Sequence, residues 1–244
     1  MPPLVAIIGP TASGKTGLAE ALCLRFNGEI VSCDSKQIYR GMDIGSGKEV
    51  GLAVPQHLID IKDPGERVTV AEYQGLAYGC IDGLLGAGKQ PFLTGGTMLY
   101  AESVLNGYTF GGRGFKEEPT LRYRSLKMGV AVEKERLREL VGLRLRRRVE
   151  EGLPTEVAGL LAKGVSAEWL KACGLEYRYF TEYCLGEISL DEAIAVTELR
   201  INQYVKRQYT WWRRHVDVQW VGGVDEAYAL TEAFLRHIKP LLVH

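Results

Sequence analysis

The first hundred residues alternate between short apolar runs and segments in which apolar positions recur with a helical period. The run over 4–8 is continuous and apolar, as in a strand buried on both faces, and it ends directly in a glycine-rich turn. After it the pattern predicts a helix over 15–26, strands over 29–33 and 58–60, a helix over 69–85, a strand over 91–94 and a helix over 97–105. Strands that alternate with helices predict a parallel sheet covered on both faces, whose ligands bind at the carboxyl ends of the strands.

The regular alternation stops at 106–119, where the chain is polar and rich in glycine, which indicates a loop. The pattern then predicts a strand over 126–132, helices over 133–151, 155–163, 174–185 and 189–215, a strand over 218–221 and a helix over 225–237. Ser189, followed three residues later by Glu192, is a capping-box start for the long helix. The length of 244 residues and the apolar content of 46% fit a single α/β domain over 1–244.

Composition excludes several classes of protein. No apolar run approaches the roughly 18 residues of a membrane span, and no basic segment precedes the first motif, so we expect a cytoplasmic protein without a membrane partner. The five cysteines are scattered and odd in number, which argues against a disulfide framework and against a zinc site. Nothing in the pattern implies a protein partner, and we expect a monomer.

The formal net charge of zero hides two basic segments. Between 113 and 148 the chain has twelve Lys or Arg against five Asp or Glu. The second group lies on the predicted helix over 189–215 and comprises Arg200, Lys206, Arg207, Arg213 and Arg214. Such groups are either solvated helix faces or contacts for a polyanion, and the chemistry elsewhere in the chain has to decide between them.

The turn after the first strand matches the phosphate-binding motif G-x-x-x-x-G-K-[ST], between a predicted strand and a predicted helix. The motif consists of Gly9, Pro10, Thr11, Ala12, Ser13, Gly14, Lys15 and Thr16. Backbone N–H groups at the helix start form a nest for phosphate oxygens, Lys15 adds a charge, and the Thr16 hydroxyl can ligate Mg²⁺. The motif indicates a ligand with a diphosphate or triphosphate, but it does not fix the reaction.

Asp34 stands at the end of the second predicted strand, at the sheet edge where ligands bind. From this position it can serve as a metal ligand or as a general base. An Asp-Ser pair is also a common helix cap or Asx turn. The residues alone leave these roles open.

Five motifs together resemble the tRNA dimethylallyltransferase family, in the order in which that family carries them. They are Gly9 to Thr16, Asp34-Ser35 with Gln37 and Tyr39, Gly41 to Lys48, Pro55 to Asp60, and Gly95 to Tyr100. Gly186 to Ser189 and Lys206 to Trp211 are similar to the family's last helix, so the resemblance extends from residue 4 to about 220. It implies a P-loop NTPase-like, three-layer α/β fold with a parallel sheet.

The resemblance implies transfer of the dimethylallyl group from dimethylallyl pyrophosphate to the exocyclic N6 of an adenine next to a tRNA anticodon. Asp34 is then the base that accepts the amine proton, because an amine conjugated to a purine is a weak nucleophile. Lys15, an Mg²⁺ held by Thr16, and Arg178 would stabilise the departing pyrophosphate. Thr97 either bonds the target adenine or its phosphate, or caps the helix that follows it.

The assignment of Arg178 departs from the family pattern. The family usually shows a Gly-Tyr-Arg/Lys-Glu element, whereas this chain has Gly174-Leu175-Glu176-Tyr177-Arg178, a register shifted by two residues. The Tyr-Arg pair is kept. The other reading of Arg178 is a surface arginine on an exposed helix.

The predicted RNA contacts follow from the need to splay the target base out of its stack. Arg200, Tyr204, Arg207 and Trp211 fall on one face of the long helix and mix cations with stacking rings, and Lys206, Arg213 and Arg214 widen this stripe. The full set of predicted tRNA contacts is Asp34, Ser35, Lys36, Gln37, Lys48, Thr97, Arg200, Tyr204, Arg207, Gln208 and Trp211. The cluster Arg144, Arg146, Arg147 and Arg148 is a second candidate contact or a solvated face.

The chain also departs from the family in length. Family members carry a helical insertion after the Gly-Gly-Thr motif, and here only 106–125 stands in its place, which predicts a shortened insertion and a reduced helical lobe. Three alternatives stay open: an adenylate dimethylallyltransferase that uses AMP, ADP or ATP as the acceptor, a P-loop small-molecule kinase, and a degenerate nucleotide-binding module.

Overall fold

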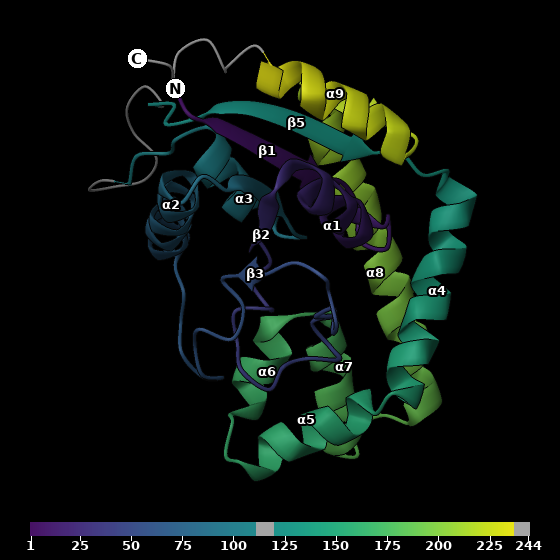
Figure 1. Cartoon of the computed structure of the whole chain (residues 1–244). Coiled ribbons are helices and arrows are strands. Elements are labelled where there is room, and N and C mark those ends of the chain that lie inside the picture. The colour runs from purple at the N-terminus through teal and green to yellow at the C-terminus, as the bar shows by residue number, and fades with distance from the viewer. Residues whose placement is uncertain (111–119, 237–244) are drawn as a thin grey trace.

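The computed structural model of the protein describes residues 1–110 and 120–236. Within them six parallel strands form one sheet in the order β3-β2-β4-β1-β5-β6. Figure 1 shows β1 and β5 side by side in this sheet. The strands are β1 (Pro3–Ile8), β2 (Gly28–Ser32), β3 (Gln56–His57), β4 (Gln90–Thr94), β5 (Arg124–Val130) and β6 (Val218–Val221). The phosphate-loop strand β1 is central, between β4 and β5, so the loop after it lies at the middle of the carboxyl edge.

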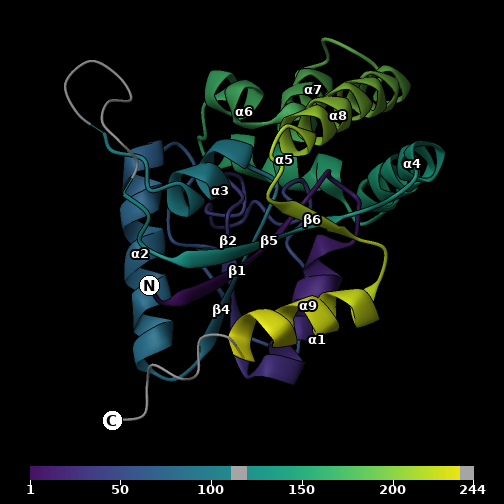
Figure 2. The same cartoon turned by 90° about the horizontal axis from the view of Figure 1, so that it is seen from above.

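Helices cover both faces of the sheet, because alternate strand residues are apolar on both sides. On one face Val5, Ile7 and Phe92 pack against α1 (Lys15–Phe26) and α9 (Val224–Arg236). On the other face Leu4, Leu93 and their neighbours pack against α2 (Val70–Gly86) and α3 (Met98–Leu105). Figure 2 shows α1 and α9 on the opposite side of the sheet from α3. The predicted three-layer α/β fold with a parallel sheet is confirmed.

The remaining helices form a lobe that closes on the carboxyl edge of the sheet (Figure 1). They are α4 (Lys134–Glu150), α5 (Leu153–Ala162), α6 (Ala167–Cys173), α7 (Leu175–Cys184) and α8 (Leu190–Arg213). The capping box predicted at the start of α8 is present. No helix among the described residues is long and apolar enough to cross a membrane.

Three details of the chain differ from the sequence prediction. The strand expected over 58–60 lies instead at Gln56–His57, because Leu58 and Asp60 adopt left-handed backbone angles that end the ladder. The strand expected over 126–132 begins and ends two residues earlier. The sequence predicted no helix at α6, which the Ser166 side chain caps by accepting a hydrogen bond from the Trp169 N–H. Of the predicted loop and insertion region, residues 111–119, which include Arg113, lie outside the described residues. Residue 237, the last of the final predicted helix, does so too.

Candidate functional site

The phosphate loop has the backbone of an anion nest. Gly9, Ala12 and Gly14 have φ of 139°, 66° and 83°, and α1 begins at the next residue, so N–H groups at the helix start converge on the loop. The ammonium of Lys15 donates to the Pro10 carbonyl at 2.6 Å. Burial, and next Arg144, lower the pKa of Lys15 to about 8, while Asp34 acts in the opposite direction. Among the residues that the structure describes, one carbonyl accepts from this buried cation, which leaves its other N–H donors available to an anion.

A cavity of about 240 Å³ lies over this loop. Its lining comprises Ala12, Ser13, Gly14, Lys15, Thr16, Gly17, Glu49, Leu140 and Arg144. The Ser13 hydroxyl is buried and has no hydrogen-bond partner among the described residues. A buried hydroxyl without a partner costs about 1–3 kcal/mol, which a bound ligand oxygen would offset. The cavity therefore has the donors and the charge for a diphosphate.

Arg144 is the arginine that the lobe places at the phosphate loop. It lies on α4, and its guanidinium makes no ion pair or hydrogen bond with the residues that the structure describes. Burial and the neighbouring Arg148 lower the pKa of Arg144 to about 10, which still leaves it charged at neutral pH. Glu49 lines the same cavity without forming an ion pair with Arg144, and a largely desolvated guanidinium with no paired carboxylate is a strong site for a phosphate oxygen.

Arg178, which the sequence assigned to the pyrophosphate, lies elsewhere. It is exposed on α7, its Nε donates to the Lys171 carbonyl at 2.9 Å, and it lines the second cavity described below rather than the one over the loop. Arg144 and Arg178 are thus on opposite sides of the site. The structure favours Arg144 for the phosphate role, because only its side chain lines the cavity of the loop.

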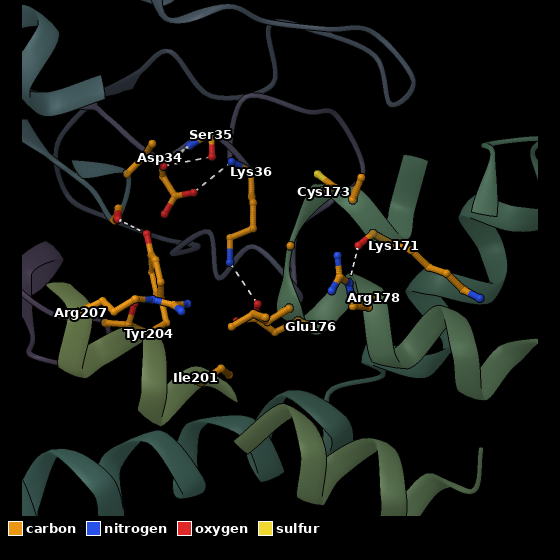
Figure 3. Close-up of a pocket in the computed structure, with 16 residues that line it drawn as sticks. Asp34, Ser35, Lys36, Lys171, Cys173, Glu176, Arg178, Ile201, Tyr204 and Arg207 are labelled. Atoms are coloured by element: carbon orange, nitrogen blue, oxygen red, sulfur yellow. Dashed lines mark hydrogen bonds and ion pairs between the residues drawn. The ribbon is translucent and has the colours of Figure 1, made fainter. Parts of the chain in front are cut away.

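A second cavity, of about 300 Å³, opens on the other side of the phosphate loop (Figure 3). Thr11 lines this cavity and the next residue lines the first, so the two meet at the loop. Asp34 points into it from the end of β2. One oxygen of this carboxylate accepts the Lys36 backbone N–H at 3.0 Å, an Asx turn that holds the side chain in place. The turn considered as an alternative role for Asp34 is present, and it leaves the second oxygen available to a ligand.

Thr97 fixes the loop that carries Asp34. Its hydroxyl oxygen accepts the Ser35 N–H at 2.9 Å and its proton is donated to the Ser35 hydroxyl at 3.0 Å. Thr97 is the N-cap residue of α3, which confirms that alternative for its position, but its side chain makes no capping hydrogen bond and is engaged with Ser35 instead. Gln37 is engaged within the same loop: it accepts from Ser32 and donates to the Gly47 carbonyl.

Two residues of the predicted stripe on α8, Tyr204 and Arg207, line the second cavity. The Tyr204 hydroxyl donates to the Gly96 carbonyl at 3.1 Å, and the Arg207 guanidinium lies over the Tyr204 ring at 5.7 Å. Gln208 is fully buried: it donates to the same carbonyl at 2.8 Å and accepts the Thr11 N–H at 2.8 Å. Gln208 joins the phosphate loop to β4 and has no exposed atom for a contact with RNA.

Other predicted RNA contacts are already engaged or point elsewhere. The Lys48 side chain is only 6% exposed and pairs with Asp43 and Asp60. The Trp211 indole N–H donates to Glu102 at 2.7 Å, although the ring stays partly exposed. Arg200 is exposed and donates to Gln203. Lys206 and Arg213 line a separate groove between α4 and α8, so they do not widen the stripe that includes Tyr204 and Arg207.

The arginine cluster on α4 has no single role. Arg146 and Arg147 are exposed and pair with Glu198 and Glu151. Arg148 is 6% exposed and pairs with Glu176 at 2.9 Å, and Glu176 also pairs with Lys36 at 3.1 Å. Neither reading of the cluster from sequence, RNA contact or solvated face, describes Arg144 and Arg148, because the lobe buries Arg148 and partly buries Arg144 against the loop at Gly47.

The stability of the protein in acid tests the pairing of the buried Glu176 carboxylate with Lys36 and Arg148. Burial alone would raise the pKa of Glu176, but Lys36 and Arg148 outweigh it and lower the pKa from 4.5 to about 2. A depressed carboxyl pKa stabilises the fold above the unfolded value and loses that effect as pH falls through the folded one. The free energy of unfolding of the wild type should therefore fall more steeply than that of Glu176→Gln between those two values. Urea unfolding at a series of pH values measures it, and parallel curves would contradict the pairing.

Gly47 lets both arginines approach the loop. Its φ is +68°, and a Cβ added there would overlap the guanidinium groups of Arg148 and Arg144. Gly47→Ala should lower both the melting temperature and the affinity for a diphosphate. Gly51 has φ +80° and open space around it, so Gly51→Ala should show only the backbone strain of about 1–2 kcal/mol. Equal diphosphate affinity in the two variants would contradict the contact.

Comparison with known proteins places these features in a family. The family model described as IPP transferase matches residues 37–122 and 111–215. The tRNA dimethylallyltransferase 1 of Parabacteroides distasonis is 35% identical, over 96% of this chain and 98% of that protein. The tRNA dimethylallyltransferase 2 of Phocaeicola vulgatus is 37% identical, over 86% of this chain and 88% of that protein.

Solved structures show the same architecture. A tRNA isopentenylpyrophosphate transferase from Bacillus halodurans superposes with a TM-score of 0.88 at 30% identity, covering 97% of this chain and 96% of that one. A tRNA isopentenylpyrophosphate transferase from Staphylococcus epidermidis gives 0.85 at 26% identity, covering 98% and 100%. A eukaryotic dimethylallyltransferase, at 19% identity and a TM-score of 0.77, shares the fold over 98% of this chain and 78% of its own. The chain belongs to the IPP transferase family.

Proposed function

We propose that this protein transfers the dimethylallyl group of dimethylallyl pyrophosphate to the N6 amine of an adenine next to the anticodon of tRNA, with release of pyrophosphate. The observation that carries the proposal is the meeting of two cavities at the phosphate loop. One holds unpaired donors and cations for a diphosphate, and the other holds the Asp34 carboxylate. Relatives named tRNA dimethylallyltransferase and a structural neighbour named tRNA isopentenylpyrophosphate transferase agree with this reaction.

The residues divide the reaction between the two cavities. As the new C–N bond forms and the C–O bond to the diphosphate breaks, the N6 amine loses a proton, which Asp34 accepts. Negative charge grows on the leaving diphosphate, where the loop N–H groups, Lys15 and Arg144 stabilise it. Because these donors are fixed before the substrate arrives, little reorganisation is needed during the reaction.

Mg²⁺ fits the loop as an ion that the diphosphate largely coordinates itself. No group of three or more His, Cys, Asp or Glu in the described chain could hold a metal by side chains alone. The half-buried Thr16 lines the loop cavity, and its hydroxyl would be a protein ligand of Mg²⁺, which usually combines few protein ligands with phosphate oxygens and waters. When bound, Mg²⁺ would neutralise charge on the leaving group.

The rim of the acceptor cavity suits a nucleotide within an RNA chain. Lys171, Arg178 and Arg207 line it, and Tyr204 presents a ring beside Asp34. A base splayed from the anticodon loop can stack on such a ring while cations at the rim contact the phosphates on either side of it. Arg178 thus has a place on the acceptor side, and Asp34, Ser35 and Thr97 form the floor beneath the base, while the Lys36 ammonium is paired with Glu176 on α7.

The alternatives are not favoured. An adenylate acceptor or an ATP-dependent kinase would not account for relatives that are named tRNA dimethylallyltransferases over nearly the whole chain. A degenerate binding module would not need Lys15, Thr16 and Asp34 all in place. The shortened insertion at 106–125, the cytoplasmic location and the monomeric state stay predictions.

A competition experiment tests the proposal. The purified protein is incubated with radiolabelled dimethylallyl pyrophosphate and Mg²⁺ in the presence of unmodified tRNA, AMP, ADP and ATP together. We expect label in the RNA fraction and no loss of ATP. Label in the adenylate fraction alone, or ATP consumption without label transfer, would overturn the proposed acceptor.

A further inference from the structure

The carboxylate of Glu176 stands between two cations on the floor of the acceptor cavity. It is 3% exposed at the start of α7, and its two oxygens pair separately, with Arg148 at 2.9 Å and with Lys36 at 3.1 Å. Figure 3 shows the Lys36 side chain extending from the Asp34 loop to Glu176. The family usually shows a Gly-Tyr-Arg/Lys-Glu element at this point, whereas this chain has Glu176 two residues after the glycine. The reaction proposed above assigns no role to Glu176.

Lys36 has two carboxylates as neighbours. Its backbone N–H already binds Asp34 Oδ1 at 3.0 Å, and Asp34 and Glu176 both stabilise its charged form. Its methylenes lie against Gly174, where an added Cβ would contact Lys36 Cδ at 2.7 Å, so the chain is steered toward α7. The ammonium therefore pairs with Glu176 in the structure, while Asp34 is the other acceptor within its electrostatic reach.

Which of the two carboxylates pairs with Lys36 matters, because an ion-paired carboxylate is a poor base. A cation at close range lowers the pKa of an aspartate by about 1–3 units, which weakens its drive to accept a proton. Lys15 and Arg144 interact with Asp34 from the cavity for the diphosphate. Of the cations that line the acceptor cavity, Lys36 belongs to the loop of Asp34 itself, whereas Lys171, Arg178 and Arg207 lie on α6, α7 and α8. The Lys36 ammonium therefore has to be kept from Asp34.

We propose that Glu176 is a positioning residue: it holds the Lys36 ammonium in an ion pair on α7 and so keeps the Asp34 carboxylate free to take the proton from the acceptor amine. The inference rests on the proposed prenyl transfer. It assigns Glu176 no contact with the substrate. Without its charge, Lys36 swings to Asp34 and the base is masked.

The test compares Glu176→Gln with the double variant Glu176→Gln/Lys36→Met. Both lose the partner of Arg148, so they differ only in whether a free ammonium remains beside Asp34. In Glu176→Gln we expect kcat at saturating tRNA to fall by about tenfold or more, because the base is masked. KM for dimethylallyl pyrophosphate should change by less than about threefold. The double variant should regain most of the lost kcat.

The outcomes separate the inference from the function on which it rests. An unchanged kcat in Glu176→Gln, or a double variant no faster than the single one, overturns the inference, since a structural role predicts a further loss. A wild-type protein that transfers no label to tRNA overturns the proposed function and the inference with it. If Glu176→Gln does not fold, the same comparison is made in an Arg148→Met background, which removes the other unpaired cation.

Discussion

Asp34→Asn should lower kcat for dimethylallyl transfer by about 10²–10⁴-fold, the range that a positioned general base contributes. The amide keeps the shape of the side chain and the hydrogen bond from the Lys36 N–H, but it cannot accept the proton of the acceptor amine. Because Asp34 lies in the acceptor cavity and not in the cavity over the phosphate loop, KM for dimethylallyl pyrophosphate should change little.

Steady-state transfer of labelled dimethylallyl groups to tRNA measures this. Asp191→Asn is the matched control, because Asp191 is an exposed carboxylate in the first turn of α8 and lines neither cavity. It should retain near wild-type turnover. Turnover of Asp34→Asn close to that of the control would remove Asp34 from the role of base.

Arg144→Met should lower kcat/KM for dimethylallyl pyrophosphate by about 10²–10³-fold, the usual cost of one donor to a developing oxyanion. Methionine keeps the apolar stem on α4 but removes the one guanidinium that lines the loop cavity in the described part of the chain. Arg178→Met is the natural comparison, since the sequence alone pointed to that residue. It should affect KM for tRNA and leave the binding of dimethylallyl pyrophosphate nearly intact.

Calorimetric titration of both variants with dimethylallyl pyrophosphate and Mg²⁺, without tRNA, isolates this difference from the chemistry. Loss of binding in Arg178→Met but not in Arg144→Met would reverse the assignment and return the leaving group to α7.

Local patterns predicted those parts of the site that are contiguous in the chain. The phosphate loop follows a buried strand and opens a helix, and Asp34 ends a second strand, so both had to reach the carboxyl edge of a parallel sheet. The position of β3 was predicted wrongly because Leu58 and Asp60 adopt positive φ angles although neither is a glycine. No sequence pattern marks such positions. Helix α6 spans seven residues, too few for a periodic signal.

The choice between Arg144 and Arg178 depends on tertiary packing, which spacing does not report directly. One signal was available. Arg144 and Arg148 follow Leu137 and Val141 at helical intervals, so both fall on the apolar stripe of α4, and an arginine on such a stripe is expected to face the protein interior. Gln208, in contrast, was predicted to contact tRNA, and only the fold shows that its amide joins the phosphate loop to the loop after β4.

Product mapping shows whether the protein prenylates tRNA and at which atom. Unmodified tRNA is treated with the protein, dimethylallyl pyrophosphate and Mg²⁺, and the RNA is then digested and analysed by mass spectrometry while released pyrophosphate is counted. We expect one dimethylallyl group per tRNA, on N6 of the adenine next to the anticodon, with one pyrophosphate released for each group transferred and no product from Asp34→Asn. Unmodified RNA, a group at another position, or equal product from Asp34→Asn would contradict this expectation.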